Sequence, residues 1–357
     1  MIPFLQLRPG EDAADVQAAM TRVVERGWFV LGPELEAFET AFAQATGSAH
    51  AVGVGTGTDA LALALRAIGV GPGDEVITSP LSAAYSALAI MMVGARPVFA
   101  DIDPARFTLD PGAAAAAVTE RTRAIMPVHI YGQPADMPAI MDVATRHRLA
   151  VVEDCCQAHL ATCGGRPVGS FGVAAAYSFY PTKNLGALGD GGAITVQDPA
   201  IAARLRRLRN GGQSDRYHHA EFGLNTRLDE IQAAILHARL SWLPAWTTRR
   251  RELAAAYRRA LPGTGVIVPP EFDPGHVYHL FPVLSERRDA LREDLHARGV
   301  ETLIHYPIPI PRQPALASEQ PAPCPIADRV CGQILSLPLH QGMTLDTVDT
   351  IAQAFRA

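Results

Sequence analysis

Short apolar segments alternate with longer amphipathic segments through the first two thirds of the chain. The apolar segments are typical of buried strands, and the amphipathic segments repeat their apolar residues at helical spacing. The predicted strands are residues 50–54, 75–78, 96–101, 123–128, 149–154 and 173–179, and residues 189–196 lead into one more. The predicted helices are residues 12–26, 34–45, 59–68, 83–93, 113–120 and 137–146. This alternation favours an α/β fold, with a mostly parallel sheet and helices on both faces.

The pattern changes after Leu228. Two long helices are predicted at residues 228–240 and 246–260, and the proline-rich last third is predicted to form a smaller α+β region. A chain of 357 residues can bury a large core and suggests two domains. We therefore expect a large domain over residues 1–245, which includes the N-terminal segment, and a small C-terminal domain over residues 246–357.

Composition and charge exclude several classes of protein. The formal net charge of −5 gives no excess of basic residues for a nucleic-acid scaffold. No apolar run is long enough to span a bilayer, and the first ten residues lack the basic and apolar regions of a secretory signal. The five cysteines have spacings that suit neither a zinc site nor a disulfide framework. We expect a cytoplasmic protein that binds neither nucleic acid nor membrane and holds no metal.

The turn at residues 178–186, Ser-Phe-Tyr-Pro-Thr-Lys-Asn-Leu-Gly, places Lys183 between two apolar strands. Most lysines lie on solvated helix faces, but these flanks place the amine at the end of a buried strand, within reach of a pocket. Partial desolvation makes the neutral amine accessible, and lysines held in this way form Schiff bases with carbonyl compounds. The sequence therefore predicts that Lys183 binds a carbonyl group.

A glycine-rich turn at residues 53–58 follows the first strand and opens a helix. Backbone N–H groups and the helix dipole attract phosphate at such a position, and Thr56 and Thr58 add hydroxyl groups. A dinucleotide-binding turn would need a further glycine near Asp59 and an acid at the end of the second strand, and this chain has neither. The turn is predicted to hold a phosphate, and a turn without a ligand is the alternative.

Asp154 ends a predicted strand, at the edge where parallel sheets bind ligands, although by itself it could equally cap the next helix. With Lys183 and the glycine-rich turn, it completes a set of three groups. They are an amine for a Schiff base, an acid for a ring nitrogen and a cradle for a phosphate. Pyridoxal 5′-phosphate is the aldehyde cofactor that needs all three, and its ring nitrogen is typically paired with Asp. The sequence therefore predicts a pyridoxal-phosphate enzyme.

Seven motifs spread over nearly the whole chain point to one family. They are residues 27–34, 57–61, 127–132, 153–159, 178–192, 225–234 and 305–307. In these motifs the chain resembles the DegT/StrS-type nucleotide-sugar aminotransferases, which are fold-type I pyridoxal-phosphate enzymes. Each motif alone is weak evidence, and together they are specific. The resemblance implies a transaminase in which the large domain, residues 1–245, binds the cofactor.

The resemblance assigns roles to individual residues. It implies that Lys183 forms the Schiff base and then moves a proton between the substrate carbon and the cofactor carbon. It pairs Asp154 with the ring nitrogen and places Gln157 against the ring hydroxyl. The implied phosphate ligands are Gly57, Thr58, Ser178 and, from the other subunit, Asn225. A site completed by the other subunit implies a homodimer with shared active sites.

The resemblance also concerns the substrates. His159 is a candidate to lie near the cofactor or the sugar, and His305 and Tyr306 are candidates to line the substrate entrance; packing roles are equally open for all three. The motifs around the lysine and at residues 225–230 look like those of relatives that aminate carbon 3 of a nucleotide-linked keto sugar. Relatives that aminate carbon 4 carry other motifs there. Glutamate is the amino donor that the family implies.

We therefore expect a transaminase that converts a dTDP-linked 3-keto-6-deoxyhexose to an amino sugar for natural product or polysaccharide biosynthesis. A 4-keto-sugar or cyclitol aminotransferase of the same family is an alternative. A pyridoxamine-phosphate-dependent sugar dehydratase is disfavoured by Lys183, because such relatives carry histidine there. A nicotinamide dehydrogenase is disfavoured by the phosphate turn. A non-catalytic regulatory protein is disfavoured by the intact set of Lys183, Asp154, Gln157 and Ser178.

Two departures from the family pattern concern the cofactor pocket. Relatives often stack an aromatic side chain on the pyridine ring, but Ala83 stands at that position here, and Tyr85 is the nearby candidate to replace it. Stacking contributes only about 0.5–1.5 kcal/mol beyond burial, so a missing stack would weaken cofactor binding without abolishing it. Cys155 and Cys156 stand where relatives have alanine, and cysteine fits there as a small apolar side chain.

Overall fold

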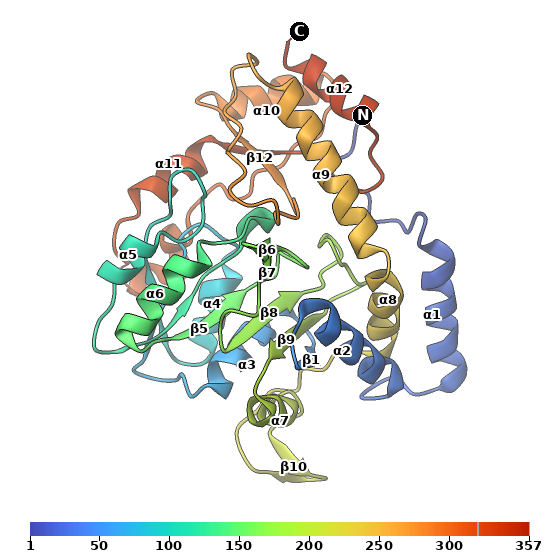
Figure 1. Cartoon of the computed structure of the whole chain (residues 1–357), viewed down its shortest axis with the longest axis vertical. Helices are drawn as coiled ribbons and strands as arrows, with labels where there is room; N and C mark the ends of the chain where they lie inside the picture. Colours follow the sequence, from blue (N-terminus) through green and yellow to red (C-terminus); the bar gives the residue numbers. More distant parts are fainter. Residues whose placement is uncertain (320, 357) are drawn as a thin grey trace.

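The computed structural model describes residues 1–319 and 321–356, and a seven-stranded sheet lies at its centre (Figure 1). The strands are β1 (His50–Val54), β2 (Glu75–Thr78), β3 (Arg96–Phe99), β4 (Thr122–Met126), β5 (Ala150–Asp154), β8 (Ala174–Ser178) and β9 (Gly192–Val196). Their order is β1-β9-β8-β5-β4-β2-β3. Within this sheet only β9 runs antiparallel to its neighbours, and the other strands share one direction. The predicted mostly parallel α/β sheet is confirmed.

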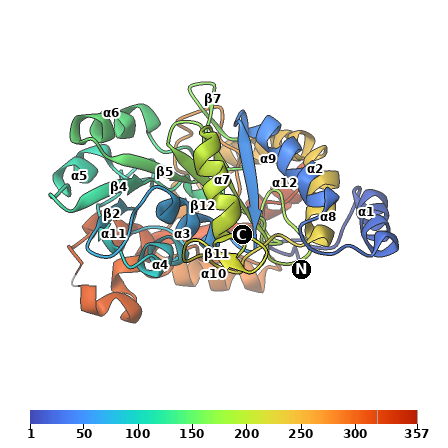
Figure 2. The same cartoon turned by 90° about the horizontal axis from the view of Figure 1, so that it is seen from below.

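Helices cover both faces of the sheet, as predicted. Alternate residues of a strand point to opposite faces, so Val52 and Val54 pack against α3 while Ala51 packs with the residues of α2. In Figure 2, α6 lies above β4 and β5, and α4 lies below them. The helices of this part are α1 (Ala13–Arg26), α2 (Pro33–Thr46), α3 (Gly57–Ala67), α4 (Tyr85–Met92), α5 (Pro111–Ala116), α6 (Met137–His147), α7 (Pro199–Leu208) and α8 (Glu230–Leu240).

The C-terminal part is built around a second, two-stranded antiparallel sheet. Strand β12 (Phe281–Leu284) pairs with β13 (Ile334–Leu337), and the ring of Tyr257 stacks on Phe281 with centroids 4.8 Å apart. The helices of this part are α9 (Leu243–Ala260), α10 (Arg288–Ala297), α11 (Pro325–Gln333) and α12 (Leu345–Ala354). The expected domain boundary at residues 245 and 246 falls inside α9. Ile2 pairs with Val300, so the first residues lie against this part of the chain.

Several small elements were not predicted. They are two short hairpins, β6 (Thr162–Cys163) with β7 (Arg166–Pro167) and β10 (Gln213–Asp215) with β11 (His218–His219), the helix α7, and the 3₁₀ turns η1 (Ile130–Gly132), η2 (Ile310–Arg312) and η3 (Pro314–Glu319). Each hairpin strand is too short to show a periodic pattern in the sequence. Among the helices of the described residues, none combines the length and apolar character needed to cross a membrane.

Candidate active site

A cavity of about 650 Å³ lies at the carboxyl ends of the parallel strands. Its walls come from the segments that follow β1, β2, β4, β5 and β8, which is where open parallel sheets bind ligands. Eight of the residues predicted for the site line it, namely Gly57, Thr58, Tyr85, Asp154, Gln157, Ser178, Lys183 and Tyr306. The topology therefore brings together side chains that lie as much as 249 positions apart in the sequence.

Lys183 lies in a tight turn directly after β8. Its backbone N–H donates to the carbonyl of Tyr180 at 2.8 Å, and the N–H of Ala187 donates to the carbonyl of Phe179 at 2.7 Å. Burial lowers the pKa of the amine, and this effect is opposed by Cys156 and Asp154 nearby. A lowered pKa increases the fraction of neutral amine, which is the nucleophilic form. Lys183 is also the only lysine in the chain, so a lysine Schiff base in this protein has one possible position.

Asp154 is the last residue of β5, and its buried carboxylate is held in a fixed orientation. Oδ1 accepts a hydrogen bond from the backbone N–H of Cys156 at 3.1 Å, and Oδ2 accepts one from the hydroxyl of Ser86 at 2.8 Å. Ser86 is in turn 3.1 Å from Ser82, hydroxyl to hydroxyl. Sequence reasoning missed Ser86, because the contact joins residues 68 positions apart and depends on how α4 packs beside β5.

The predicted phosphate cradle forms where α3 begins. The hydroxyl of Thr56 accepts from the N–H of Asp59 at 3.0 Å and so caps the helix, which leaves the first-turn N–H groups of Gly57 and Thr58 toward the cavity. Gly57 is required by close packing, because an added Cβ would lie 2.6 Å from the Cβ of Ser178. A helix start of this kind suits an anion.

Ser178 completes the cradle from the end of β8. Its hydroxyl oxygen accepts a hydrogen bond from the backbone N–H of Tyr180 at 3.3 Å. This contact occupies a lone pair of the hydroxyl and leaves its proton to be donated into the cavity that Ser178 lines. The start of α3 and the end of β8 therefore line the same cavity.

Gln157 has its amide fixed by one backbone contact. Its Oε1 accepts from the N–H of Tyr131 at 2.7 Å, so its Nε2 is the end that points at the cavity and donates to the phenol oxygen of Tyr306 at 3.1 Å. Burial raises the pKa of Tyr306 to about 12, so this phenol is neutral at physiological pH. The phenol of Tyr131 donates to the carbonyl of His305 at 2.5 Å. Tyr131, which sequence reasoning treated only as part of a motif, thus positions both Gln157 and the 305–306 segment.

Tyr85 and Ala83 both line the cavity at the start of α4. The side chain of Tyr85 is 61% exposed, so its ring is free to cover a bound group. Ala83, at the position where relatives have an aromatic residue, offers only a methyl group. This placement agrees with the expectation that Tyr85 substitutes from nearby.

Three predicted site residues lie outside the cavity. His159 is fully buried with its ring centroid 5.8 Å from that of Tyr177 and 5.7 Å from that of Phe179, and burial lowers its pKa to about 3. Aromatic side chains surround the ring, as in the packing alternative, and its candidate role near the cofactor or the sugar stays a prediction. Asn225 is exposed and lines neither this cavity nor any other described for the chain.

His305 lies behind the cavity wall that Tyr306 forms. Its Nδ1 is 3.0 Å from the hydroxyl of Ser336, and its ring stacks on Phe4 with centroids 5.6 Å apart. Burial, and next the charge of Lys183, lower the pKa of His305 to about 4. In these contacts His305 packs behind Tyr306 as a neutral residue, and its place at the substrate entrance stays a prediction.

A buried group of His129, Glu153 and Cys155 lies beside Asp154. Glu153 accepts hydrogen bonds from the N–H groups of Gly169, Phe171 and Gly172 at 2.7–2.8 Å, and His129 lies 3.2 Å from it. Because Ala135 donates to Nδ1 of His129 at 3.0 Å, Nε2 carries the proton and donates to Glu153. The atoms of His129 and Glu153 are committed to protein partners, so these two residues stabilise the end of β5 and are not free to bind a metal.

The residues of the cavity fit a phosphorylated pyridine aldehyde. One volume contains a partly desolvated amine, a fixed carboxylate without a cationic partner among the described residues, and an anion cradle. Pyridoxal phosphate would be held by Lys183, by Asp154 at its ring nitrogen and by the start of α3 at its phosphate. When bound, the cofactor supplies an electron sink for carbanion chemistry.

Comparisons with known proteins agree with this site. Residues 11–356 match the model of the DegT/DnrJ/EryC1/StrS aminotransferase family. The chain is 48% identical over 364 residues to dTDP-3-amino-3,4,6-trideoxy-alpha-D-glucose transaminase of Streptomyces venezuelae, covering 99% of this chain and 96% of the relative. It is 44% identical over 357 residues to dTDP-3-amino-3,6-dideoxy-alpha-D-galactopyranose transaminase of Aneurinibacillus thermoaerophilus, covering 99% and 98%.

The fold agrees as well. The crystal structure of S. venezuelae DesV in complex with a ketimine intermediate superposes with a TM-score of 0.95 at 46% identity, covering 100% of this chain and 99% of that one. The predicted fold, transaminase class and pyridoxal-phosphate cofactor are therefore confirmed. The chain belongs to the DegT/DnrJ/EryC1/StrS aminotransferase family.

Proposed function

We propose that this enzyme transfers the amino group of glutamate to carbon 3 of a nucleotide-linked keto sugar, with a dTDP-linked 3-keto-6-deoxyhexose as the acceptor. The observation that carries the proposal is the shared cavity of Lys183, Asp154 and the start of α3. The names of the two relatives, both dTDP-linked 3-amino sugar transaminases, support the choice of sugar, nucleotide and carbon.

The proposed roles follow from the contacts. Lys183 holds the cofactor and then, as a free amine of lowered pKa, moves the proton between substrate and cofactor carbons. Asp154, oriented by Ser86, would pair with the ring nitrogen and keep it protonated. Gln157 donates from Nε2 to the ring hydroxyl, and Tyr306 lies beside it at the substrate side. Tyr85 covers the ring.

Activity assays can test the substrate directly. Purified enzyme is given glutamate with dTDP-linked or UDP-linked keto sugars, with the keto group at carbon 3 or carbon 4, and 2-oxoglutarate is measured. We expect the dTDP-linked 3-keto sugar to give the highest kcat/KM. A preference for a 4-keto sugar would move the enzyme to the alternative within the same family.

We also propose that the enzyme is a homodimer in which Asn225 of one subunit contacts the phosphate held by the other. Three observations support this. Asn225 is exposed and absent from the cavity of its own chain, and Tyr180, 52% exposed, brings apolar surface to the cavity mouth. Trp28 and Phe29 in a family motif are also more than half exposed, as expected of residues that another copy covers.

Mixing two inactive variants tests the shared site. Consider a heterodimer in which one subunit carries Lys183→Ala and the other carries Asn225→Asp. If Asn225 acts across the interface, one active site of this heterodimer contains both changes and the other contains neither. A 1:1 mixture of the variants, allowed to exchange subunits, should then recover on the order of one quarter of wild-type activity, because half of the dimers have one intact site. Recovery of no activity after demonstrated exchange would place Asn225 in the site of its own subunit, and full activity of Asn225→Asp by itself would place Asn225 outside the site.

We propose that residues 1–245 form the cofactor-binding domain and residues 246–357 the small domain. We also propose a cytoplasmic location, supported by five free cysteines, of which three are buried as thiols.

A further inference from the structure

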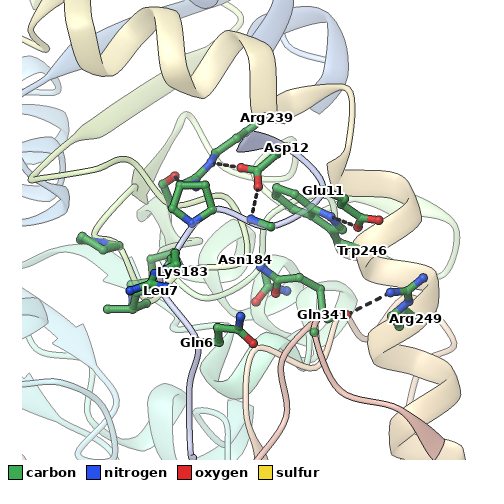
Figure 3. Close-up of a pocket in the computed structure, with 16 residues that line it drawn as sticks. Gln6, Leu7, Glu11, Asp12, Lys183, Asn184, Arg239, Trp246, Arg249 and Gln341 are labelled. Carbon is green, nitrogen blue, oxygen red and sulfur yellow. Dashed lines mark hydrogen bonds and ion pairs between the residues drawn. The ribbon is translucent and has the colours of Figure 1, made fainter. Parts of the chain in front are cut away.

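A second cavity, of about 190 Å³, lies beside the lysine turn of residues 180–187 (Figure 3). Its walls are the N-terminal segment of residues 6–12, the lysine turn, the helices α8 and α9, and the loop at Gln341. Leu185 and Ala187 anchor the end of the lysine turn in the core. Lys183 itself borders the second cavity, so side-chain packing does not hold the turn on this side, and its position there depends on hydrogen bonds.

One buried guanidinium reaches the lysine turn across this space. Arg239 on α8 donates from Nη1 to the carbonyl of Gly186 at 2.6 Å. Among the described residues, no other side chain donates to a main-chain carbonyl of the lysine turn. The turn is closed on itself at this point, because an added Cβ on Gly186 would lie 2.6 Å from the carbonyl oxygen of Pro181. A contact that holds Gly186 therefore also restrains Pro181, two positions before Lys183.

The N-terminal segment fixes Arg239 in turn. Nε of Arg239 lies 2.7 Å from Oδ2 of Asp12, and the two side chains are only 9% and 5% exposed. Oδ1 of Asp12 accepts a hydrogen bond from the N–H of Gly10 at 2.9 Å. The indole of Trp246 on α9 donates to Glu11 at 2.8 Å, and Figure 3 shows this contact beside the ion pair. The guanidinium therefore has one orientation, set by a carboxylate on one side and by the lysine turn on the other.

We propose that Arg239 is a positioning residue for the reaction, because it fixes the turn in which Lys183 presents its amine. The inference rests on the proposed function, which assigns a proton transfer to Lys183. An amine that takes a proton from one carbon and gives it to another must stay aligned with both, and a displacement of about 1 Å can slow such a step on the order of 100-fold. Arg239 does not line the cofactor cavity, so it acts through Gly186 and not by contact with a substrate.

The charge of Arg239 does not account for this role. After burial, the groups that shift the pKa of Lys183 are Cys156 and Asp154. The charge of Arg239 is opposed by that of Asp12 at 2.7 Å, which leaves little net field at the amine. The effect of Arg239 on Lys183 is therefore one of geometry.

The test compares rates of the cofactor-loaded enzyme. Arg239→Met keeps much of the side-chain length and removes both hydrogen bonds. The maximal rate of the glutamate half-reaction should fall on the order of 10- to 100-fold, whereas half-saturating glutamate should change less than about threefold. Deuterium at the α-carbon of glutamate should slow the variant more than wild type, because proton transfer is the impaired step. Arg239→Lys, which can still donate to the carbonyl of Gly186, should recover part of the rate.

Hydrogen exchange of the purified enzyme gives a readout that does not depend on activity. In the lysine turn the N–H of Lys183 donates to the carbonyl of Tyr180 at 2.8 Å, and the N–H of Ala187 donates to that of Phe179 at 2.7 Å. In Arg239→Met, amides of residues 179–187 should exchange on the order of tenfold faster than in wild type, because the turn opens more often.

Arg288→Met is the matched control. Arg288 also joins a carboxylate, that of Asp289 at 2.8 Å, to a carbonyl, that of Cys331 at 2.7 Å, but it lines neither cavity. This control should leave both the glutamate half-reaction and the exchange of residues 179–187 as in wild type. If Arg239→Met does not fold, Asp12→Asn replaces it in the test. That variant removes the charge that orients the guanidinium and should also slow proton transfer.

Two results would overturn the proposal. One is an unchanged maximal rate in a folded Arg239→Met or Asp12→Asn variant, and the other is an equal loss of rate in the Arg288→Met control. Unchanged exchange of residues 179–187 in the same variant would also contradict it. Failure of the proposed function would look different, because wild type would then show no glutamate half-reaction while the contrast in hydrogen exchange would remain.

Discussion

Ser86 holds Asp154 by a hydrogen bond of 2.8 Å from its hydroxyl to Oδ2 of the carboxylate. With Oδ1 held by the N–H of Cys156, the carboxylate has both oxygens engaged and cannot rotate without breaking a contact. The consequence is an acidic group of fixed orientation in the cavity that the start of α3 also lines.

The first prediction concerns this contact. Ser86→Ala should weaken cofactor binding about tenfold, because a hydrogen bond to a charged group contributes roughly 1.5–3 kcal/mol and part of that aligns Asp154. The cofactor dissociation constant, measured from visible absorption, checks the change. Ser82→Ala is the matched control, since Ser82 reaches Asp154 only through Ser86. Equal losses in the two variants would contradict a direct role for Ser86.

The second prediction concerns the ring that covers the cofactor. Tyr85→Ala should weaken cofactor binding by about 0.5–1.5 kcal/mol, which is the usual contribution of aromatic stacking. Adding Ala83→Phe to that variant should restore the loss, because residue 83 lines the same cavity. Equilibrium dialysis of the cofactor measures both effects. If adding Ala83→Phe restored no cofactor affinity, an aromatic ring at position 83 would not cover the same face of the cofactor as the ring of Tyr85.

The third prediction concerns pH. Burial lowers the pKa of His159 and of His276 to about 3, and that of His305 to about 4. Between these values and the unfolded value near 6.5, the unfolded chain binds more protons than the folded chain. Stability should therefore fall as the pH falls from about 6.5 towards 4, by up to about 1.4 kcal/mol per pH unit for each such group.

Urea unfolding at pH 7.5, 6.0 and 5.0 measures this dependence. His159→Gln should lower stability at pH 7.5 and should also flatten the pH dependence, because one buried histidine no longer gains a proton on unfolding. If the unfolding free energy of the variant depended on pH as steeply as that of wild type, His159 would not contribute to the pH dependence of stability.

The fourth prediction compares a buried ion pair with an exposed one. Arg239→Ala leaves Asp12 buried without its partner and should cost about 3–5 kcal/mol of unfolding free energy. Arg312→Ala breaks the pair with Asp328, also 2.7 Å long, but Arg312 is 63% exposed, so the loss should stay below about 1 kcal/mol. Chemical denaturation measures the unfolding free energy of both variants. Similar losses of unfolding free energy in the two variants would contradict the structural role given to Arg239.

Much of the site could be predicted from the sequence because its residues lie at the carboxyl ends of strands or shortly after them. Asp154 and Ser178 each end a strand whose apolar pattern is clear, and Gly57 comes shortly after another; parallel strands bring their carboxyl ends to one edge. Lys183 and Gln157 then follow within a few residues of those ends. The pattern also gave β1 and β2 with the bounds that the structure has.

The remainder depends on contacts between distant segments, which local patterns do not report. Ser86 reaches Asp154 through the packing of α4, and Tyr131 reaches His305 across 174 positions. His159 lies in a motif near the site, but the turn after β5 directs its ring into the core beside Tyr177. The ion pair of Arg239 with Asp12, which shapes the second cavity, joins residues 227 positions apart.

The most direct test of the whole account is to find where the cofactor is covalently attached. Wild-type enzyme with pyridoxal phosphate should absorb visible light, and reduction with borohydride should fix one cofactor per chain on the peptide that contains Lys183, the only lysine present. Lys183→Ala should show neither the absorption nor the labelled peptide. A wild-type enzyme that takes up no cofactor, or a label that persists in Lys183→Ala, would contradict the account.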